Sequence, residues 1–592
     1  TNHFTSSGIV ASDCAMPDSP ENNFATLNIL NYSSASATMS EGNLAHTSSS
    51  PHISAVSTMA LPKSGKYYWE VRLNNTSTNG SNSIGLARVN FDATSAIFFG
   101  SANGVSIYGS TGATFGDSAL GVTWDKTGSA TTFTAQNVIG VAYDADGKNV
   151  KFYKNGTEID YNITDFDDAT YDILPAISAY GVPTNSGNVI NFGQDSTFAG
   201  AVSAGTATDA NGYGLFKHAP PSGGYLALCT SNLPEPTIGA NSDTQADDHF
   251  NTVLYSGDDS THAITVGFKP DFVWLKKRSA SSSHRLYTSS TYGGPYSAGA
   301  SGSRYLKSND TSAEGAGTAK SLISMDTNGF TVHGNGGDTN ANGSTYVAWN
   351  WKANGGTTVS NTDGSITSTV QANTDAGFSI VTYTGNGSNA TVGHGLTTSS
   401  PDMVIVKNRT AGTTGAWLVY HSANTSAPET DYLRLNGTEA TADINTVWND
   451  TAPTSSVFSI GTSSNVNTNT HTYLAYCFHS VEGYSKCGSY IGNGNADGTF
   501  VYLGFRPSWI MWKRTDSSGS SWGIVDSARN TYNVMGQTLY PDLSNAENTN
   551  NYCDFTANGF KIRGTSGFQN ASGGTYIYMA FAESSFKYAN AR

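Results

Sequence analysis

The sequence carries little charge. Only 13% of its 592 residues are charged, and the net charge of −15 is spread thinly along the chain. Proteins that bind a phosphate backbone gather Lys and Arg on one face, so the lack of a basic cluster argues against a nucleic-acid partner. No stretch approaches the roughly 18 consecutive apolar residues that span a bilayer, and residues 1–13 lack the basic and apolar regions of a signal peptide. We therefore expect neither nucleic-acid binding nor membrane insertion.

Cysteine is scarce as well. The chain has five cysteines in scattered positions, namely Cys14, Cys229, Cys477, Cys487 and Cys553. An odd number without regular spacing argues against a disulfide framework, and the CxxC or His pairs of a zinc site do not occur. Free buried thiols are one interpretation, and a disulfide between Cys477 and Cys487 across a hairpin is the alternative. We predict a chain that folds in a reducing cytosol and needs no cofactor.

The chain is rich in glycine, tyrosine and uncharged polar residues. It contains 64 Gly and 31 Tyr, and 37% of its residues are hydrophobic. This much apolar surface argues against disorder, and the near absence of helical periodicity favours β structure punctuated by glycine. Because one hydrophobic core does not grow to this chain length, several domains are expected. We predict an all-β chain of tandem β-sandwiches.

The C-terminal part of the chain repeats one pattern three times. The pattern opens on a Tyr motif, which occurs as VLYSGD (253–258), IVTYTGNG (380–387) and GSYIGNG (488–494). It closes on a Tyr-led strand, which occurs as TYVAWNWK (345–352), TYLAYCFH (472–479) and TYIYMAFA (575–582). The opening tyrosines lie 128 and 107 residues apart, and the closing tyrosines lie 127 and 103 residues apart. This agreement predicts three tandem copies of one β unit.

Each copy also contains a Pro-led strand that ends in basic residues. The three strands are KPDFVWLKKR (269–278), SPDMVIVKNR (400–409) and RPSWIMWKR (506–514). Their recurring bases are Lys276, Lys277, Arg278, Lys407, Arg409, Lys513 and Arg514. We interpret these bases as structural groups that cap carbonyls or pair with acids, and an anion site is the alternative.

The first third of the chain has a different pattern. GVAYDADGKNVKFYKNG (140–156) alternates apolar residues on both sides of an Asp-Gly turn and predicts a β-hairpin. Prolines at 220, 221, 234 and 236 cannot lie inside a sheet, so a boundary is expected near 220–248. We predict a β-sandwich at 1–222, a linker at 223–248, copy 1 at 249–356, a linker at 357–376, copy 2 at 377–486 and copy 3 at 487–592.

Candidate catalytic or metal-binding residues are few. Asp144 and Asp146 have the opening spacing of a calcium loop, but the glutamate at its twelfth position is missing, so an exposed hairpin turn is favoured. For the acidic run Asp165, Asp167 and Asp168, a solvated loop is favoured over a weak chelator or a carboxylate pair. None of the twelve His residues lies in a metal-ligand pair or beside a nucleophile elbow. We expect no enzymatic activity.

One segment of copy 1 favours a binding function. STYGGPYSAGASGSRY (290–305) places Tyr292, Tyr296 and Tyr305 among Gly and Ser, where the other copies have no equivalent. Tyr rings on a polar loop can stack on sugar faces or grip a neighbouring subunit. An ordinary surface loop is the alternative.

The N-terminal motifs resemble a known module. The order KYYWEV (66–71), IGLA (84–87), the 140–156 hairpin, LPAIS (174–178) and NVINFG (188–193) is similar to an SPRY-type domain, a concanavalin-like antiparallel β-sandwich. The resemblance implies a binding scaffold that carries variable loops at one end. Such scaffolds generally recognise protein or carbohydrate and perform no catalysis.

The three copies resemble a second family. HFNTVLYSGD, GFKPDFVWLKKR and YVAWNWKANGG in copy 1 are similar to a repeat of unknown function in tail-fibre and structural proteins of marine tailed phages. The resemblance implies a virion protein, assembled in the host cytoplasm and exposed on the particle as a tail fibre or another appendage for host attachment. A capsid decoration or fibre protein without a receptor role, or a polysaccharide depolymerase, is the alternative.

The same resemblance suggests partners. Fibre proteins present weak sites together by being oligomeric, so we expect a homo-oligomer, with a trimer favoured. Other virion proteins and a host surface glycan or envelope protein are the further partners expected.

Overall fold

The computed structural model describes most of the chain. Its described residues are 17–19, 22–32, 37–48, 53–74, 82–89, 104–109, 111–116, 123–126, 131–164, 172–179, 188–240, 243–291, 302–317, 321–397, 399–410 and 415–588. The chain divides into two compact units, Thr1–Glu235 and Pro236–Arg592. Strands dominate both units, and the α-helices among these residues are single turns, α1 (Asn445–Trp448) and α2 (Ser464–Asn467). The all-β prediction is confirmed, and no helix in the described part is long and apolar enough to cross a membrane.

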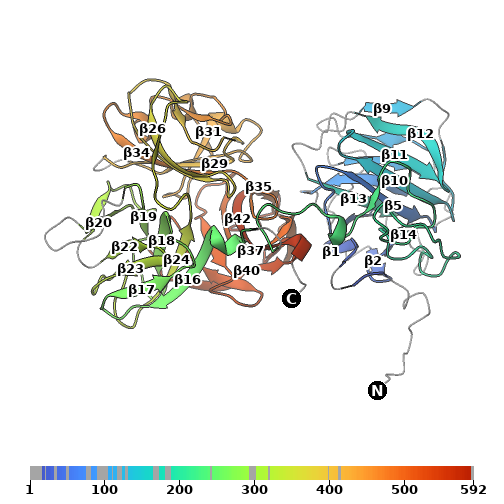
Figure 1. Ribbon diagram of the computed structural model, residues 1–592, viewed down its shortest axis with the longest axis horizontal. Helices are drawn as coiled ribbons and strands as arrows, with labels where there is room; N and C mark the ends of the chain where they lie inside the picture. Colours follow the sequence, from blue (N-terminus) through green and yellow to red (C-terminus); the bar gives the residue numbers. More distant parts are fainter. Residues whose placement is uncertain are drawn as a thin grey trace, which may run out of the picture. The chain divides into compact units, whose positions relative to one another are not determined.

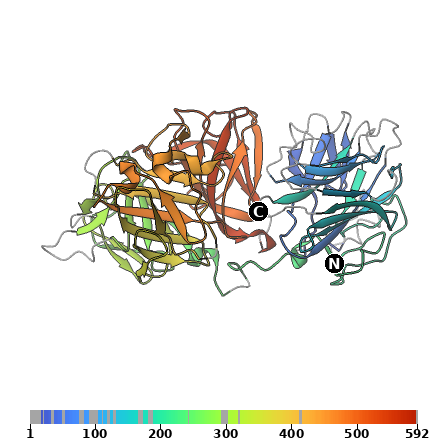
Figure 2. The same cartoon turned by 90° about the horizontal axis from the view of Figure 1, so that it is seen from above.

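The first unit contains two large sheets (Figure 2). One has the order β1 (Leu27–Tyr32), β4 (Ile53–Ser57), β13 (Ile173–Ala179), β6 (Ser83–Arg88), β7 (Gly104–Tyr108) and β8 (Thr114–Phe115). The other has the order β2 (Ala37–Ser40), β3 (Ala45–Ser48), β14 (Asn188–Asn191), β5 (Lys66–Arg72), β10 (Val138–Asp144), β11 (Asn149–Lys154), β12 (Thr157–Thr164) and β9 (Thr123–Lys126). Buried apolar residues of both sheets, such as Leu86, Val141 and Ile177, form the core.

The predicted hairpin is present in the first unit. On β10 and β11, Val141 pairs with Phe152 and Tyr143 pairs with Val150. The turn between the strands is closed by Asp144, whose Oδ1 accepts a hydrogen bond from the backbone N–H of Gly147 at 2.8 Å. The alternation of apolar residues around an Asp-Gly turn therefore gave the correct register.

The chain that follows this sandwich stays attached to it. Glu70 on β5 is buried and accepts hydrogen bonds from the backbone N–H groups of Lys217 and His218, both at 2.8 Å. Strand β15 (Leu226–Ala227) then pairs in parallel with β5. The first part of the segment expected as a linker, 223–248, thus belongs to the first unit.

In the second unit, each copy contains a sheet with one shared strand order. In copy 1 this sheet is β16 (Phe250–Ser256), β24 (Thr345–Trp351), β18 (Phe272–Lys277) and β19 (Arg285–Thr288). Its equivalents in copy 2 are β27 (Phe378–Thr384), β34 (Thr472–Phe478), β29 (Met403–Asn408) and β30 (Leu418–His421). Those in copy 3 are β35 (Ser485–Ile491), β42 (Thr575–Ser585), β37 (Phe505–Arg514) and β38 (Gly523–Asp526).

A smaller sheet completes each copy. In copy 1 it is β17 (His262–Thr265), β23 (Gly329–Val332) and β22 (Leu322–Asp326), with β20 (Gly302–Tyr305) and β21 (Gly315–Gly317) as a separate pair. In copy 2 it is β28 (Ala390–Gly393) and β33 (Val457–Ile460), and in copy 3 it is β36 (Asp497–Tyr502), β41 (Gly559–Arg563), β40 (Asn548–Thr556) and β39 (Met535–Thr538). In copy 1, Phe330 on the small sheet and Val273 on the large sheet share one buried cluster, so the two sheets pack face to face.

The opening and closing tyrosines of each copy are partners in the large sheet. The register pairs are Tyr255 with Tyr346, Tyr383 with Tyr473, and Tyr490 with Tyr576. Their rings are stacked with centroids 5.0, 5.1 and 4.8 Å apart, respectively. The spacing that defined the repeat in the sequence thus corresponds to one paired strand register in all three copies.

Copy 2 has a larger sheet than its neighbours. Residues 357–376, which we expected to be a linker, contribute β25 (Val359–Asn361) and β26 (Ser368–Asn373), and β26 pairs with β27. Residues 431–443 add β31 (Asp431–Arg434) and β32 (Ala442–Asp443) at the other edge. Strands thus extend this sheet where we expected a linker. The prediction was wrong because the alternation in 366–373 lies among polar residues.

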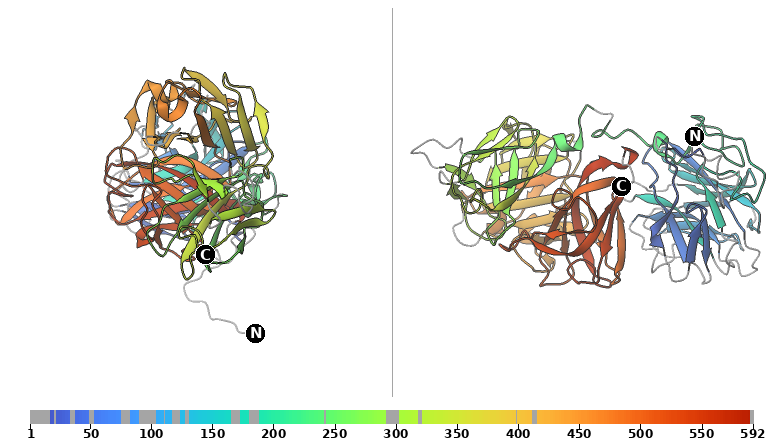
Figure 3. Two further views of the ribbon diagram at one scale, coloured as in Figure 1. Left: turned by 90° about the vertical axis from the view of Figure 1, so that its left-hand side faces the viewer. Right: turned by 90° about the horizontal axis from the view of Figure 1, so that it is seen from below.

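The three copies surround a common centre. Figure 1 shows them as a green, a yellow-orange and a red lobe, with β18, β24, β29, β34, β37 and β42 on the inner side, and the left view of Figure 3 shows the lobes around one point. One buried cluster joins side chains of all three copies, among them Trp351, Phe478 and Phe581. The large sheets therefore bury both faces, one inside their own copy and one against the other copies.

The tyrosine hydroxyls should contribute measurably to stability. Tyr473 Oη accepts from the backbone N–H of Thr468 at 2.6 Å and donates to the Ser464 carbonyl oxygen at 2.9 Å. Tyr473→Phe leaves these groups without their partner, so we expect it to lower the free energy of unfolding by about 2 kcal/mol in urea titrations. Tyr532→Phe is the control, since Tyr532 is 84% exposed, and an equal loss in both variants would contradict this role.

Candidate functional site

The copies contact one another through equivalent positions. At each of three interfaces, a ring N–H of one copy donates to a backbone carbonyl oxygen of another. The pairs are Trp417 Nε1 with Lys307 O and Trp522 Nε1 with Arg434 O, both at 2.8 Å, and His284 Nε2 with Tyr540 O at 2.9 Å. Copy 2 thus contacts copy 1, copy 3 contacts copy 2, and copy 1 contacts copy 3, so the interfaces close a ring within one chain.

In copy 1, His284 lies where copies 2 and 3 have Trp417 and Trp522, and the ring of Trp274 packs beside it. Because a carbonyl oxygen can only accept, His284 carries its proton on Nε2, and its Nδ1 accepts from Trp274 Nε1 at 2.8 Å. Burial lowers the pKa of His284 well below its ordinary value, which keeps the ring neutral. At the position of Trp274, copies 2 and 3 have the smaller side chains of Ile405 and Met511.

A second set of bonds lies at the last residue of β19, β30 and β38. The pairs are Thr288 Oγ1 with Tyr476 Oη at 2.7 Å, His421 Nε2 with the Tyr578 carbonyl oxygen at 3.1 Å, and Trp349 Nε1 with Asp526 Oδ2 at 3.0 Å. Each pair again joins two different copies in cyclic order. The chemistry differs at the three interfaces, so each interface is specific for its own partner.

The recurring lysines are buried and bind carbonyl oxygens. Lys276, Lys407 and Lys513 have no exposed surface, and each Nζ donates to the carbonyl oxygen of the next residue at 3.0, 3.0 and 2.7 Å. Lys276 also reaches the Ser544 carbonyl of copy 3, and Lys407 reaches the Thr311 carbonyl of copy 1. Burial lowers the pKa of each lysine to about 8. These contacts agree with the structural interpretation of the bases.

The recurring arginines pair with acids across two of the interfaces. Arg278 of copy 1 binds both oxygens of Glu547 in copy 3, at 2.9 and 3.0 Å. Arg409 of copy 2 binds both oxygens of Glu314 in copy 1, each at 2.9 Å. At the third interface, Arg514 turns to Asp516 of its own copy instead.

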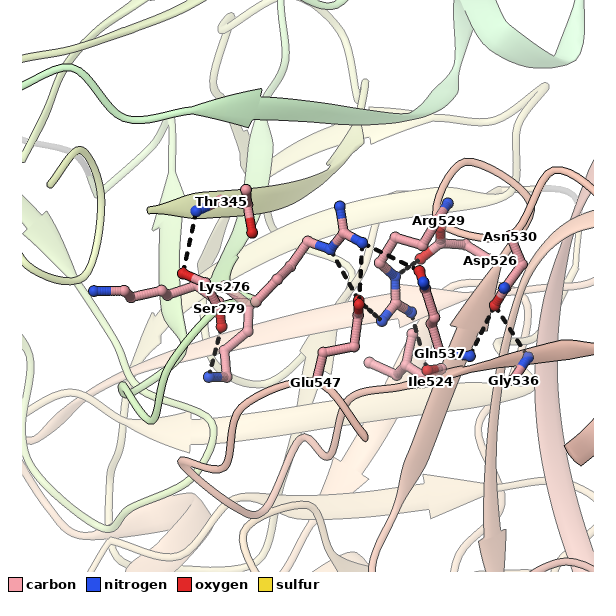
Figure 4. A network of polar contacts seen from close by, with 12 residues as sticks. Lys276, Ser279, Thr345, Ile524, Asp526, Arg529, Asn530, Gly536, Gln537 and Glu547 are labelled. Carbon is pink, nitrogen blue, oxygen red and sulfur yellow. Dashed lines mark hydrogen bonds and ion pairs between the residues drawn. The ribbon is translucent and has the colours of Figure 1, made fainter. Parts of the chain in front are cut away.

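The interface between copies 1 and 3 holds a charged network, drawn in Figure 4. Arg529 and Asp526 are completely buried and bound at 2.6 Å between Nε and Oδ2. Arg529 also reaches Glu547, which Arg278 binds from copy 1. Although burial acts in the opposite direction, these two guanidinium groups hold the pKa of Glu547 below its ordinary value. The first and last copies of the chain are thus joined by paired charges.

The contacts of this network indicate a structural role, in which it holds copies 1 and 3 together. Both oxygens of Asp526 and of Glu547 accept hydrogen bonds from protein donors. A general acid or base needs a proton or lone pair within reach of a substrate, and these carboxylates are committed to arginine and tryptophan. The network therefore supports a fixed arrangement of the copies.

At one position, copy 3 has an aspartate where copies 1 and 2 have an asparagine. Asn309 and Asn436 accept a hydrogen bond through Oδ1 from the backbone N–H of His284 and of Trp417, at 3.0 and 2.8 Å. In copy 3, Asp542 accepts from the backbone N–H of Trp522 at 3.1 Å. Burial raises the pKa of Asp542 to about 6.

The tyrosines expected to bind are only partly described. Tyr292 and Tyr296 lie outside the described residues. Tyr305 lies on β20, half-buried, where the guanidinium of Arg285 is 3.9 Å from its ring centroid and Tyr287 is an edge contact at 6.1 Å. This ring is therefore packed into copy 1.

The other candidates have ordinary protein partners where they are described. Asp144 Oδ2 lies 2.8 Å from Lys66 Nζ, and Asp146 Oδ1 accepts from the backbone N–H of Gly65. Asp165, Asp167 and Asp168 lie outside the described residues. In the described part, no His, Cys, Asp and Glu side chains gather as metal ligands would. The four cysteines described there, Cys229, Cys477, Cys487 and Cys553, are free, and all except the half-buried Cys487 are buried, so no disulfide joins Cys477 to Cys487.

Sequence reasoning missed the ring of interfaces. Its signal is a Trp or His directly before β19, β30 and β38, namely His284, Trp417 and Trp522. This residue follows the preceding Arg by eight positions in copies 2 and 3 but by six in copy 1, where it is also a His, so the signal is weak without the strand register.

Comparison with known proteins gives two family matches. Residues 245–585 match a family described as a domain of unknown function, DUF7483, and residues 66–195 match the SPRY domain. A comparison with curated proteins gave no match. The predicted SPRY-type domain is confirmed by its family match.

Three solved structures are similar to part of this chain. The SPRY domain of human HERC1 is 15% identical, with a TM-score of 0.22, over 28% of this chain and 94% of that one. The PSpry domain of TRIM65 is 12% identical, with a TM-score of 0.21, over 28% and 90%. Stonustoxin is 19% identical, with a TM-score of 0.20, over 28% and 26%.

The acid at position 542 predicts a pH-dependent stability. Since burial raises the pKa of Asp542 to about 6, against about 3.9 in an unfolded chain, ionisation costs the folded state about 3 kcal/mol well above pH 6. This cost disappears as the pH falls through 6 to below about 4. Asp542→Asn should therefore raise the free energy of unfolding by about 2 to 3 kcal/mol at about pH 8 and leave it unchanged at about pH 3.5.

Urea titrations at the two pH values measure this difference. Asp443→Asn is the matched control, since Asp443 is exposed at the edge of copy 2. A stability gain of Asp542→Asn that does not depend on pH would contradict the assignment.

Proposed function

Because the chain belongs to the DUF7483 family and carries an SPRY domain ahead of that region, we propose that it is a structural and adhesive protein of a tailed-phage particle. In this proposal it is a tail fibre or another appendage that presents β-sandwich modules to the host envelope. It acts by binding and has no catalytic role. It is assembled in the host cytoplasm and exposed on the extracellular particle.

The observation that carries this proposal is the closed ring of three copies. An appendage must hold its binding surfaces in fixed positions while it is exposed outside the cell. The ring meets this need without disulfides, through ring N–H donors, buried lysines and arginine pairs at interfaces such as that of Arg278 with Glu547. The sparse surface charge favours contacts by neutral hydrogen bonds and aromatic rings.

A polysaccharide depolymerase is the alternative of a different class. Its hydrolysis needs two carboxyl groups that face a substrate groove. The buried carboxylates at the interface of copies 1 and 3 are paired with arginine, which favours the structural proposal. A capsid decoration protein without a receptor role differs only in its place on the particle.

The three-fold arrangement within the chain bears on the expected homo-oligomer. Three linked copies already present related surfaces together, so one chain gains from high effective concentration without a second chain. The proposal retains a homo-oligomer, with a trimer favoured, as the state on the particle. It would have to form through surfaces outside the central cluster of Trp351, Phe478 and Phe581, since that cluster is buried.

Electron microscopy of intact particles tests the proposal. Particles that carry an epitope tag on this chain should bind gold-labelled antibody on projecting appendages or at the tail tip, and untagged particles are the control. Label over the capsid shell would favour the decoration alternative. Absence of the chain from purified particles would contradict a virion role altogether.

A further inference from the structure

A polar cavity of about 650 Å³ lies at the surface of copy 3. Three segments line it, the loop 514–521 after β37, the stretch 540–552 and the loop 566–568. Ligand sites in proteins commonly have volumes of about 300 to 1,000 Å³. The cavity is therefore large enough for a short oligosaccharide.

Aromatic rings form one wall of this cavity. Tyr540 and Phe568 are half-buried, with centroids 5.7 Å apart, and Tyr552 lies 5.6 Å from Phe568. Trp512 packs behind them, 5.2 Å from Phe568 and 5.8 Å from Tyr552. A rigid aromatic wall of this kind offers ring faces for stacking at low conformational cost.

Neutral polar groups form the rest of the cavity. Asn545, Asn548 and Asn550 are exposed around it, and Asn548 Nδ2 donates to Tyr540 Oη at 3.0 Å. Amides of this kind can donate and accept at once, as sugar hydroxyls do. The one cation of the lining, Arg514, is bound to both oxygens of Asp516, at 2.8 and 3.0 Å. The lining is thus close to electrically neutral.

In copies 1 and 2, a hydrogen bond crosses the position that corresponds to this cavity of copy 3. Asp338 of copy 1, Asn465 of copy 2 and Phe568 of copy 3 each follow the residue whose carbonyl accepts the closing tyrosine hydroxyl. Asp338 accepts from Ser282 Oγ, and Asn465 accepts from the backbone N–H of Ala416. Each bond ties this position to the adjoining loop. Phe568 has no side-chain acceptor, so the corresponding loop in copy 3 is not tied to it.

Copy 3 also lacks the arginine side chain that fills the corresponding space in copy 1. Arg285 starts β19, binds Asp338 and stacks on Tyr305. The first residue of β38 is Gly523 instead, and a Cβ atom there would lie 2.7 Å from Phe568. Copy 3 thus has an aromatic wall where copy 1 has a closed ion cluster.

We propose that this cavity of copy 3 is a binding site for a neutral oligosaccharide. The rings of Tyr540 and Phe568 stack on a sugar face, and Asn548 and its neighbouring amides bind the hydroxyl groups. The inference rests on the adhesive role proposed above and names its binding site and ligand class. Neutral sugars fit better than acidic ones because the lining cation is already paired and the chain has a net charge of −15.

Ligand-observed NMR with the full chain tests the site. The probes are maltotriose, diacetylchitobiose and N-acetyllactosamine, with sialyllactose as the acidic comparison. We expect at least one neutral probe to bind with a dissociation constant of about 1 mM, and its affinity to change little with salt because few charges take part. Asn548→Ala and Tyr540→Ala should each weaken this binding about tenfold.

The exposed position of Asn548 and one control variant make the test decisive. Asn548 is exposed on β40, so Asn548→Ala keeps the fold even if Tyr540→Ala does not. Tyr532→Ala is the matched control, since Tyr532 is an exposed aromatic of the same copy outside the lining, and it should bind as the wild type does. Failure of every neutral probe, binding of sialyllactose alone, or unchanged binding in Asn548→Ala and a folded Tyr540→Ala would each overturn the proposal.

The particle experiment separates this inference from the proposed function. If the chain is found on appendages but no neutral sugar binds, the adhesive role stands and the cavity is not its sugar site. If sugars bind but the chain is absent from particles, the site stands and the virion role fails.

Discussion

The two-faced burial of each large sheet is the constraint on which the second unit depends. On strands such as β24, residues of one face pack inside the copy, and Trp349 and Trp351 on the other face pack against other copies. A single copy would expose these indoles to water, at a cost of about 25 cal/mol per Å² of apolar area. The copies therefore stabilise one another, and the three of them close a ring in which these faces are buried. The interface hydrogen bonds then fix which copy lies beside which.

The interfaces show how one position tolerates different side chains. Where copies 2 and 3 donate from Trp417 and Trp522, copy 1 donates from His284, and Trp274 fills the space behind it. Volume and hydrogen bonding are thus kept while the residues change. A buried polar group without a partner would cost about 1 to 3 kcal/mol, so such changes must occur in compensating pairs. Copy 3 likewise has a cavity where copy 1 has an ion cluster.

Part of the fold could be predicted from the sequence. The hairpin of β10 and β11 follows from local alternation, and the three copies of one β unit follow from the repeated spacing of their motifs. The ring could not be predicted, because its bonds join residues that lie 88, 110 and 256 positions apart in the sequence. The cavity could not be predicted for a related reason. It arises from single residue differences at positions such as Gly523 and Phe568. The corresponding positions of the other copies can be found only from the strand register, and the sequence instead predicted a binding loop in copy 1, at 290–305.

Differential scanning calorimetry of the full chain tests most directly whether the three copies form one cooperative body. Residues 236–592 should unfold in a single transition, separate from that of the first unit, with equal calorimetric and van 't Hoff enthalpies. Glu547→Gln, which removes the shared acid of Arg278 and Arg529 at the interface of copies 1 and 3, should move this whole transition to lower temperature. Three separate transitions, or a shift confined to one part of the unit, would contradict the account.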